Sequence, residues 1–228
     1  MDESIETIEY KGYYIKIYPD DCMESPRQWD NLGILLTYHP HYDFNMGKND
    51  KNIRDEFDCE YQTKQEIERD IIKEYNPVIM ASIYLYDHSG LRLKIGNFNN
   101  CGLLQGHAEF DTSHIGYILA TKEQVKKEWQ VKRISKKLKE QVKRNLEAEI
   151  DAMDKYVSGQ VYGYNIENIA EENLDGCWGF YEYDYMIEEA KNSIDCHIEE
   201  ERKSKQNKLK TLIKNHVNLI KRQELLTV

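Results

Sequence analysis

The stretch Ser82–Gly96, "SIYLYDHSGLRLKIG", decides the fold class of this 228-residue chain. Apolar side chains alternate with other residues on both sides of the tetrapeptide Asp87–Gly90, and this period of two is typical of strands. Aspartate at the first position and glycine at the fourth are favoured in a type I turn. The stretch therefore predicts an antiparallel β-hairpin over residues 82–96.

Strand patterns recur on both sides of this hairpin. Residues 13–21 alternate isoleucine with tyrosine and lysine, which predicts one buried and one exposed face. Residues 33–39 are continuously apolar, so we expect both faces of that strand to be covered. Three more segments have strand character: 114–121, 159–167 and 177–185.

Helical patterns occupy three other parts of the chain. Thr63 and Glu66 form a capping-box pattern at the start of a helix predicted over 63–75. Residues 122–156 carry an apolar side chain every three or four positions and predict one long helix. A third helix follows residue 185. Its segment 199–208 contains no apolar side chain and is not expected to pack on a core.

Together these patterns predict an α+β fold. Its sheet is mainly antiparallel, contains the hairpin 82–96, and is packed by helices 63–75 and 122–156 and by a long C-terminal helix. We expect a single α+β domain over residues 1–198 and a protruding helix over 199–228. The apolar stripe that resumes after residue 208 would pack back on the body or pair with another chain, which would make a homodimer through this helix.

The composition indicates a globular protein, with 40 % hydrophobic residues and 17 tyrosines against 5 phenylalanines. Tyrosine rings gather on half-buried sheet faces and on recognition surfaces, and both interpretations stay open. The net charge of −10 argues against a protein whose whole surface binds nucleic acid. The charge is segregated: residues 175–201 hold nine acids and one base, and residues 202–222 hold eight bases and no acid.

The cellular setting is predicted from what the sequence lacks. Its five cysteines have no CxxC spacing, which fits reduced thiols in a cytosol. The start "MDESIETIEY" has no signal-peptide pattern, and no apolar run is long enough to span a membrane. We expect a cytoplasmic protein with no membrane partner.

The stretch Glu24–Gly33, "ESPRQWDNLG", is the most unusual in the chain. Serine followed by proline is a helix-start signal, with Ser25 as the cap. One short turn would follow, with Trp29 packed inward. Arg27, Asp30 and Asn31 would then stay free to bind a partner.

The segment "HPHYD" follows the end of a predicted strand, where binding residues often lie. His39, His41 and Asp43 could ligate a divalent metal ion, the one cofactor that the residues suggest. A polar turn is the simpler interpretation of the same residues.

The tetrapeptide of the hairpin invites a Ser-His-Asp interpretation, but triad residues are brought together by the fold rather than by adjacency. The simpler interpretation is a structural turn that presents Asp87 and His88 for binding. No complete catalytic signature is present, so no residue is assigned a catalytic role and we favour a protein that is not an enzyme.

Basic residues crowd the predicted helix 122–156, where residues 122–144 hold ten Lys or Arg and three acids. A solvated helix face is the simpler interpretation. The alternative is a surface that contacts phosphates or an acidic partner, made by Lys132, Arg133, Lys136 and Lys137.

Three motifs occur together in this chain: "ESPRQWDNLG", "YLYDHSG" and "CWGFY". In this combination the chain resembles a family of uncharacterised bacteriophage and mobile-element proteins, over most of residues 10–185. The resemblance implies a phage accessory protein in a bacterial host cytosol. Such genes often encode counter-defence proteins.

Three functions are compatible with these observations. The first is an anti-CRISPR-like inhibitor, an acidic protein that binds a host immune effector protein or ribonucleoprotein and blocks its nuclease. The second is a metal-dependent enzyme acting on nucleic acid or nucleotide, with a site drawn from Asp30, His39, Asp87 and His88. The third is a phage assembly factor that oligomerises through the terminal helix.

Overall fold

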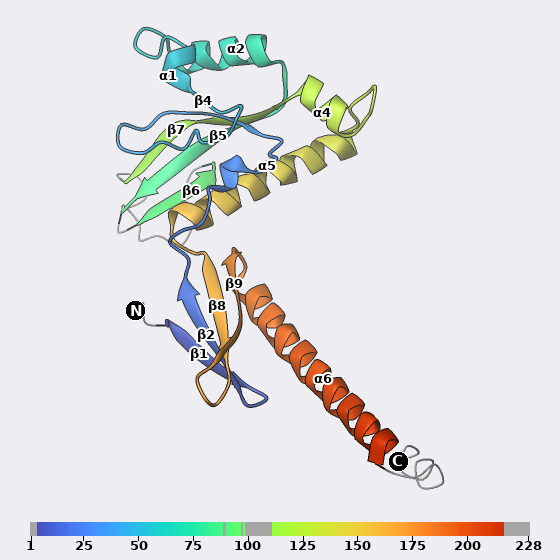
Figure 1. Ribbon diagram of the computed structural model, residues 1–228. Coiled ribbons are helices and arrows are strands. Elements are labelled where there is room, and N and C mark those ends of the chain that lie inside the picture. The colour runs from blue at the N-terminus through green and yellow to red at the C-terminus, as the bar shows by residue number, and fades with distance from the viewer. Residues whose placement is uncertain (1–3, 89, 97, 99–110, 217–228) are drawn as a thin grey trace. The chain divides into compact units, whose positions relative to one another are not determined.

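The computed structural model describes residues 4–88, 90–96, 98 and 111–216, and it confirms the α+β class (Figure 1). The chain divides into two compact units. Unit 1 contains residues 1–20 and 161–228, and unit 2 contains residues 21–160. The sequence patterns place a boundary only at residue 198, so this division is information that the structure adds.

Unit 2 is built on a five-stranded sheet, sheet B, with the order β4-β3-β7-β5-β6. Its strands are β3 (Ile34–Thr37), β4 (Lys51–Asn52), β5 (Pro77–Asp87), β6 (Leu91–Ile95) and β7 (Thr112–Thr121). Only the short β3–β4 pair is parallel. Strands β5 and β6 pair from Ile83 with Ile95 to Asp87 with Leu91, which confirms the predicted hairpin.

Sheet B lies between two helical layers (Figure 1). Helix α5 (Lys136–Val157) packs on one face, and α1 (Ile53–Glu56) and α2 (Lys64–Tyr75) pack on the other. Strand β3 shows how this works, since Leu35 faces α5 while Ile34 and Leu36 face the α1–α2 layer. Both faces of this apolar strand are therefore covered, as predicted.

The predicted helix 122–156 is two helices. Helix α4 ends at Glu128, and α5 begins at Lys136 after its N-cap Ser135, whose hydroxyl accepts a hydrogen bond from the Leu138 backbone N–H. Gln130 between them has a φ of 50°, a left-handed conformation that no α-helix contains. The apolar repeat runs through this break without revealing it, because α4 (Lys122–Glu128) and α5 both pack on the same core.

Unit 1 is built on a four-stranded antiparallel sheet, sheet A, with the order β1-β2-β8-β9. Its strands are β1 (Glu6–Tyr10), β2 (Tyr13–Pro19), β8 (Tyr162–Glu167) and β9 (Asn173–Phe180). Strand β1 was not predicted. It joins β2 through Lys11 and Gly12, both at positive φ, and lysine is a poor sequence signal for such a turn.

Helix α6 (Tyr183–His216) covers one face of sheet A with its first half (Figure 1). Met186, Ala190 and Ile194 are buried against Ile15, Ile17 and the inward residues of β8. From Glu199 to His216 the helix continues without a break but is exposed, apart from the half-buried Ile213. The prediction that residues 199–208 do not pack on a core is confirmed. The expectation that the later apolar stripe packs back on the body is wrong for its described residues, since Leu209 and Leu212 are both exposed. Pairing of this stripe with another chain stays a prediction.

Two other expectations bear on the described residues. Cys22, Cys59, Cys177 and Cys196 form no disulfide bond with one another, and Cys101 lies outside the described residues. Across 4–88, 90–96, 98 and 111–216, no helix has the length and apolar character needed to cross a membrane.

Candidate functional site

The turn at Ser25 is formed as predicted, but the side chain that it buries is Arg27 rather than Trp29. Ser25 caps a single 3-10 turn over Pro26–Gln28, and its hydroxyl accepts a hydrogen bond from the Arg27 backbone N–H. The Arg27 side chain is 2 % exposed, whereas Trp29 is 50 % exposed. The expectation of an inward Trp29 and a free Arg27 is therefore wrong.

Arg27 is buried because it joins three segments of unit 2. Its Nε and Nη2 donate to the two carboxylate oxygens of Asp50, at 2.9 and 2.7 Å. Its Nη1 donates to Glu149 of α5 at 2.9 Å, and Nη2 also donates to the Gly33 carbonyl at 2.7 Å. This fork geometry is the one that an arginine offers to a pair of carboxylates.

The two carboxylates are satisfied from their other sides as well. Asp50 accepts hydrogen bonds from the backbone N–H groups of Leu35 and Gly47. Glu149 accepts from the backbone N–H groups of Leu32 and Gly33. This network holds the entry to β3 in place, and it uses the Arg27 guanidinium within the fold rather than for a partner molecule.

Asp30 and Asn31 lie elsewhere, along a groove of about 580 Å³ that α4 and α5 also line. Asp30 is exposed there, and its role in binding stays a prediction. Asn31 has a local role, since its amide donates to the carbonyls of Pro26 and Trp29. This groove contains neither Arg27 nor His39 nor Asp87.

One end of sheet B does bring two of the sequence motifs together. The His39 ring stacks on Tyr42 with centroids 5.0 Å apart, and the Tyr42 hydroxyl hydrogen-bonds to Asp87 of the hairpin. Burial lowers the pKa of His39 and the nearby His41 lowers it further, while the Asp87 carboxylate acts in the opposite direction. Burial and Asp87 together raise the pKa of Tyr42.

Another histidine of this end, after His39 and His41, comes from the hairpin itself. His88 Nδ1 lies 3.3 Å from the Asp111 carboxylate. His41 and Asp43 are exposed, and the Asp43 carboxylate accepts from the Asn45 backbone N–H within the turn. In the part of the chain that the structure describes, no three His, Cys, Asp or Glu side chains are placed to share a metal ion.

The four basic candidates surround the start of α5. Lys132 and Arg133 lie on the α4–α5 connection rather than on a helix face, and Lys136 and Lys137 form the first turn of α5. All four are exposed, and none makes an ion pair with another described residue. Positive charge at a helix N-terminus opposes the helix dipole, so the local fold does not explain this cluster.

A further histidine, His114 on β7, is half-buried between the rings of Tyr84 and Tyr117. Its Nε2 is buried and has no hydrogen-bond partner among the described residues. Burial and the nearby Lys64 lower its pKa to about 4, although Glu68 opposes them. The folded protein therefore holds this imidazole neutral where an exposed histidine would begin to gain a proton.

This burial predicts a loss of stability in mild acid. Because the pKa of His114 is lower in the folded state, the unfolded chain binds the proton more tightly, and stability falls as the pH drops from about 6.5 towards 4. Allowing for partial solvent access, we expect about 2 kcal/mol of this loss to come from His114. Urea unfolding at pH 7.5 and 4.5 measures it: His114→Phe should lose about 2 kcal/mol less than the wild type between the two pH values. Equal losses in both proteins would contradict the assignment.

One face of sheet A is not covered by α6. Ile15 and Ile17 face α6, so the alternate residues of β2 face the other side. Glu6 pairs with Ile17 and accepts a hydrogen bond from the Tyr183 hydroxyl of α6, which places its neighbour Ile5 on that other side. We call this side the open face; its residues are Ile5, Thr7, Glu9, Tyr14, Lys16, Tyr18, Asn165, Glu167 and Trp178.

The open face has an apolar end. Ile5 is 56 % exposed and Trp178 is 48 % exposed. Between them Tyr18 stands 5.9 Å from the Trp178 ring, centroid to centroid. The indole rests on Gly163, where a Cβ would lie only 2.2 Å from Trp178 Cε3, so this glycine makes room for the ring.

The rest of the open face is polar and then acidic. Lys16 forms a salt bridge of 2.6 Å with Glu167, which occupies the one basic side chain of the face. Glu9 pairs in register with Tyr14 next to it. The open face thus carries two exposed apolar side chains and a tyrosine at one end and two carboxylates at the other.

Comparisons of the chain with protein-family models, with curated proteins and with solved structures give no match.

Proposed function

We propose that this protein is a non-enzymatic binding protein that uses the open face of sheet A to block a host defence effector, in the manner of an anti-CRISPR inhibitor. The observation that carries the proposal is the apolar row on the open face, made by the exposed Ile5 and Trp178 and the half-buried Tyr18 between them. Tryptophan and tyrosine are the side chains that most often dominate binding energy at protein interfaces. Rows of this kind on a small protein mark interaction surfaces.

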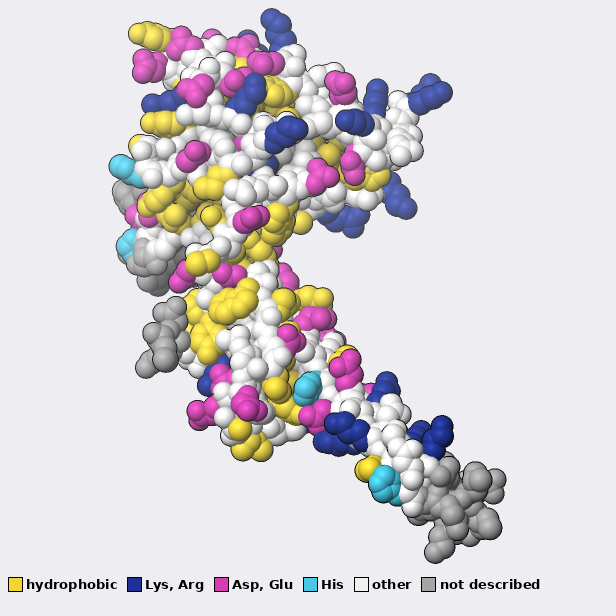
Figure 2. All heavy atoms as spheres, in the orientation of Figure 1, with side chains coloured by type: hydrophobic (Ala, Val, Ile, Leu, Met, Phe, Trp, Pro, Cys, Tyr) yellow, Lys and Arg dark blue, Asp and Glu magenta, His cyan; other side chains and the backbone are white. Residues whose placement is uncertain are grey.

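The surroundings of the row select a basic partner. Glu9 and Glu167 stand at the other end of the open face, and residues 175–201 of the same unit hold nine acids and one base. Figure 2 shows acidic side chains in magenta around sheet A, whereas dark blue basic side chains gather on the exposed half of α6. An acidic surface with an apolar anchor complements a channel built to hold nucleic acid.

The resemblance to phage accessory proteins supplies the setting of this proposal. A phage protein made in the bacterial cytosol meets the nucleases of the host, whose nucleic-acid channels are basic. Occupying such a channel needs no catalytic group. The partner in this proposal is the protein part of an effector, free or in its ribonucleoprotein.

The test is inhibition of purified effectors. We expect the protein to form a stable complex with a CRISPR nuclease from a bacterial panel and to stop its cleavage of DNA. Trp178→Ala should weaken that complex about 30-fold, the result of losing about 2 kcal/mol at a central aromatic anchor. Both the inhibition constant and a direct binding measurement report this change.

Tyr61→Ala is the matched control, because this tyrosine is 84 % exposed in unit 2 and lies outside the open face. It should bind as the wild type does. Failure to inhibit any effector of the panel would reject the proposed function. Inhibition that Trp178→Ala and Ile5→Ala leave unchanged would reject the open face as its site.

A further inference from the structure

Unit 1 also contains a recessed site, on the opposite side of sheet A from the open face. It is a cavity of about 220 Å³ between α6 and the strands β2, β8 and β9. Pockets for drug-sized ligands usually measure roughly 300–1,000 Å³, so this one suits a single side chain or a similarly small group.

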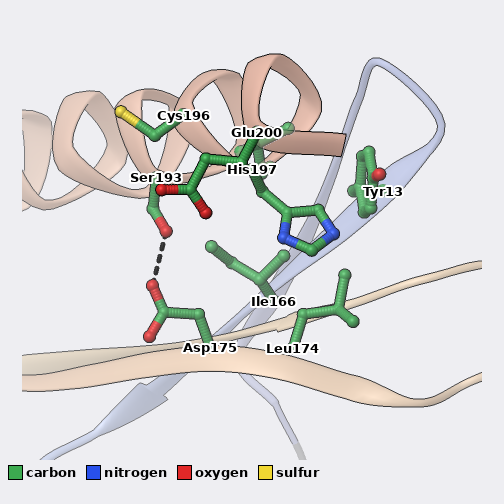
Figure 3. A pocket seen from close by; sticks show the side chains of 9 residues that line it. Tyr13, Ile166, Leu174, Asp175, Ser193, Cys196, His197 and Glu200 are labelled. Atoms are coloured by element: carbon green, nitrogen blue, oxygen red, sulfur yellow. Dashed lines mark hydrogen bonds between the residues drawn. The ribbon is translucent and has the colours of Figure 1, made fainter. Parts of the chain in front are cut away.

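The floor and one wall of the cavity are apolar or aromatic. Ile166 and Ile194 are buried beneath it. At one side the rings of Tyr13 and His197 meet edge to face, with centroids 6.0 Å apart (Figure 3). A flat cationic group gains energy against such rings when it leaves water.

Two carboxylates face this wall. Asp175 of β9 accepts a hydrogen bond from the Ser193 hydroxyl of α6, which fixes its position at the cavity (Figure 3). Glu200 reaches the cavity from the next turns of the same helix. None of the nine lining residues is a lysine or an arginine, so no side chain of the cavity carries a permanent positive charge.

Glu200 differs from the glutamates on either side of it. Glu199 lies near Arg202 and Lys203, and Glu201 pairs with Lys205 at 2.8 Å. Glu200 forms no ion pair with any described residue, although Lys203 is three positions away. Of these three consecutive glutamates, the one that lines the cavity is the one whose carboxylate is not paired with a described basic side chain.

We propose that this cavity binds a guanidinium group, that of an arginine side chain on a partner protein. The planar group would lie against Tyr13 and donate to Asp175 on one side and Glu200 on the other. Arginine fits this combination better than lysine does, because its planar fork stacks on aromatic rings and donates to two carboxylates at once. This inference does not depend on the open face, since the two sites lie on opposite sides of sheet A.

The experiment titrates N-acetyl-arginine amide into the full-length protein and follows backbone amide shifts by NMR. We expect shifts confined to the cavity residues and a dissociation constant in the millimolar range, typical of one isolated side chain. N-acetyl-lysine amide should bind at least about 5-fold more weakly, since its ammonium is more strongly hydrated and stacks poorly.

Two variants and a matched control locate the site. Glu200→Gln and Asp175→Asn should each weaken binding about 5-fold or more, while Glu199→Gln, one residue away and outside the cavity, should change it less than 2-fold. Glu200 is exposed, so its variant tests the site without disturbing the core. An equal response to lysine amide, an equal effect of Glu199→Gln, or the absence of shifts at the cavity would each overturn the assignment. The open-face variant Trp178→Ala should still bind arginine amide, which separates failure of this site from failure of the proposed function.

Discussion

Replacing Arg27 by alanine is expected to lower the free energy of unfolding by about 3–5 kcal/mol. The substitution removes four hydrogen bonds and leaves the carboxylates of Asp50 and Glu149 without their counter-ion. The Asp50 side chain is 1 % exposed, so water does not replace the guanidinium there. An uncompensated buried charge costs more than the pair itself contributes.

Two further variants make the test specific. Arg27→Lys keeps the charge but has no fork, so it should recover part of the loss and remain well below the wild type. Arg69→Ala is the control: this arginine is exposed and stands 3.8 Å from Glu66, and its removal should change stability by less than about 0.5 kcal/mol. Urea unfolding followed by circular dichroism measures all three. A loss below 1 kcal/mol for Arg27→Ala would show that the network is not needed for the fold.

The same residue shows where sequence reasoning reached its limit. The serine cap and the proline of "ESPRQWDNLG" were predicted correctly, because both act within one turn of chain. Whether Arg27 or Trp29 points inward depends on Asp50 and Glu149, which are 23 and 122 residues away. Because both carboxylates are there to pair with it, the arginine is buried, and the indole is half exposed.

Local signals elsewhere were reliable for the same reason. The Thr63–Glu66 capping box is formed with both of its hydrogen bonds, and the hairpin around Asp87 pairs as expected. The break at Gln130 was missed because no glycine or proline marks it. The division into two units was missed because residues 1–20 pair with strands beyond residue 161.

The candidate sites show the same contrast between local patterns, which the sequence reveals, and contacts between distant segments, which it does not. The alternation along β2 predicts one face with Tyr14, Lys16 and Tyr18, and the structure has that face. That Ile5 and Trp178 complete its apolar end depends on the order β1-β2-β8-β9, which joins segments more than 140 residues apart in the chain. The cavity beside Glu200 depends on the same sheet order and on α6.

The second large effect is expected at Gly116, in the middle of β7. Gly116→Ala should lower the free energy of unfolding by about 3 kcal/mol or more, through overpacking and backbone strain together. Gly116 has a φ of 144°, which L-residues rarely adopt, and a Cβ there would lie 2.0 Å from the Leu36 carbonyl oxygen of β3. The contact is with backbone, so relieving it requires β3 and β7 to separate at the pair that joins Thr37 to Gly116.

Gly90→Ala separates these two contributions. Gly90 has a similar φ of 138°, but a Cβ there would meet no atom within 4 Å. It should therefore show only the backbone cost, about 1 kcal/mol, and the difference between the two variants measures the clash with β3. Equal losses would mean that the strands shift freely at Gly116.

In a Trp29→Phe, Trp129→Phe background, Trp178 is the one tryptophan left and lies in unit 1. Each unit has its own core. When Gly116→Ala is added to this background, the fluorescence transition of Trp178 should therefore keep its midpoint, while the circular dichroism signal of unit 2 should be lost at a lower urea concentration.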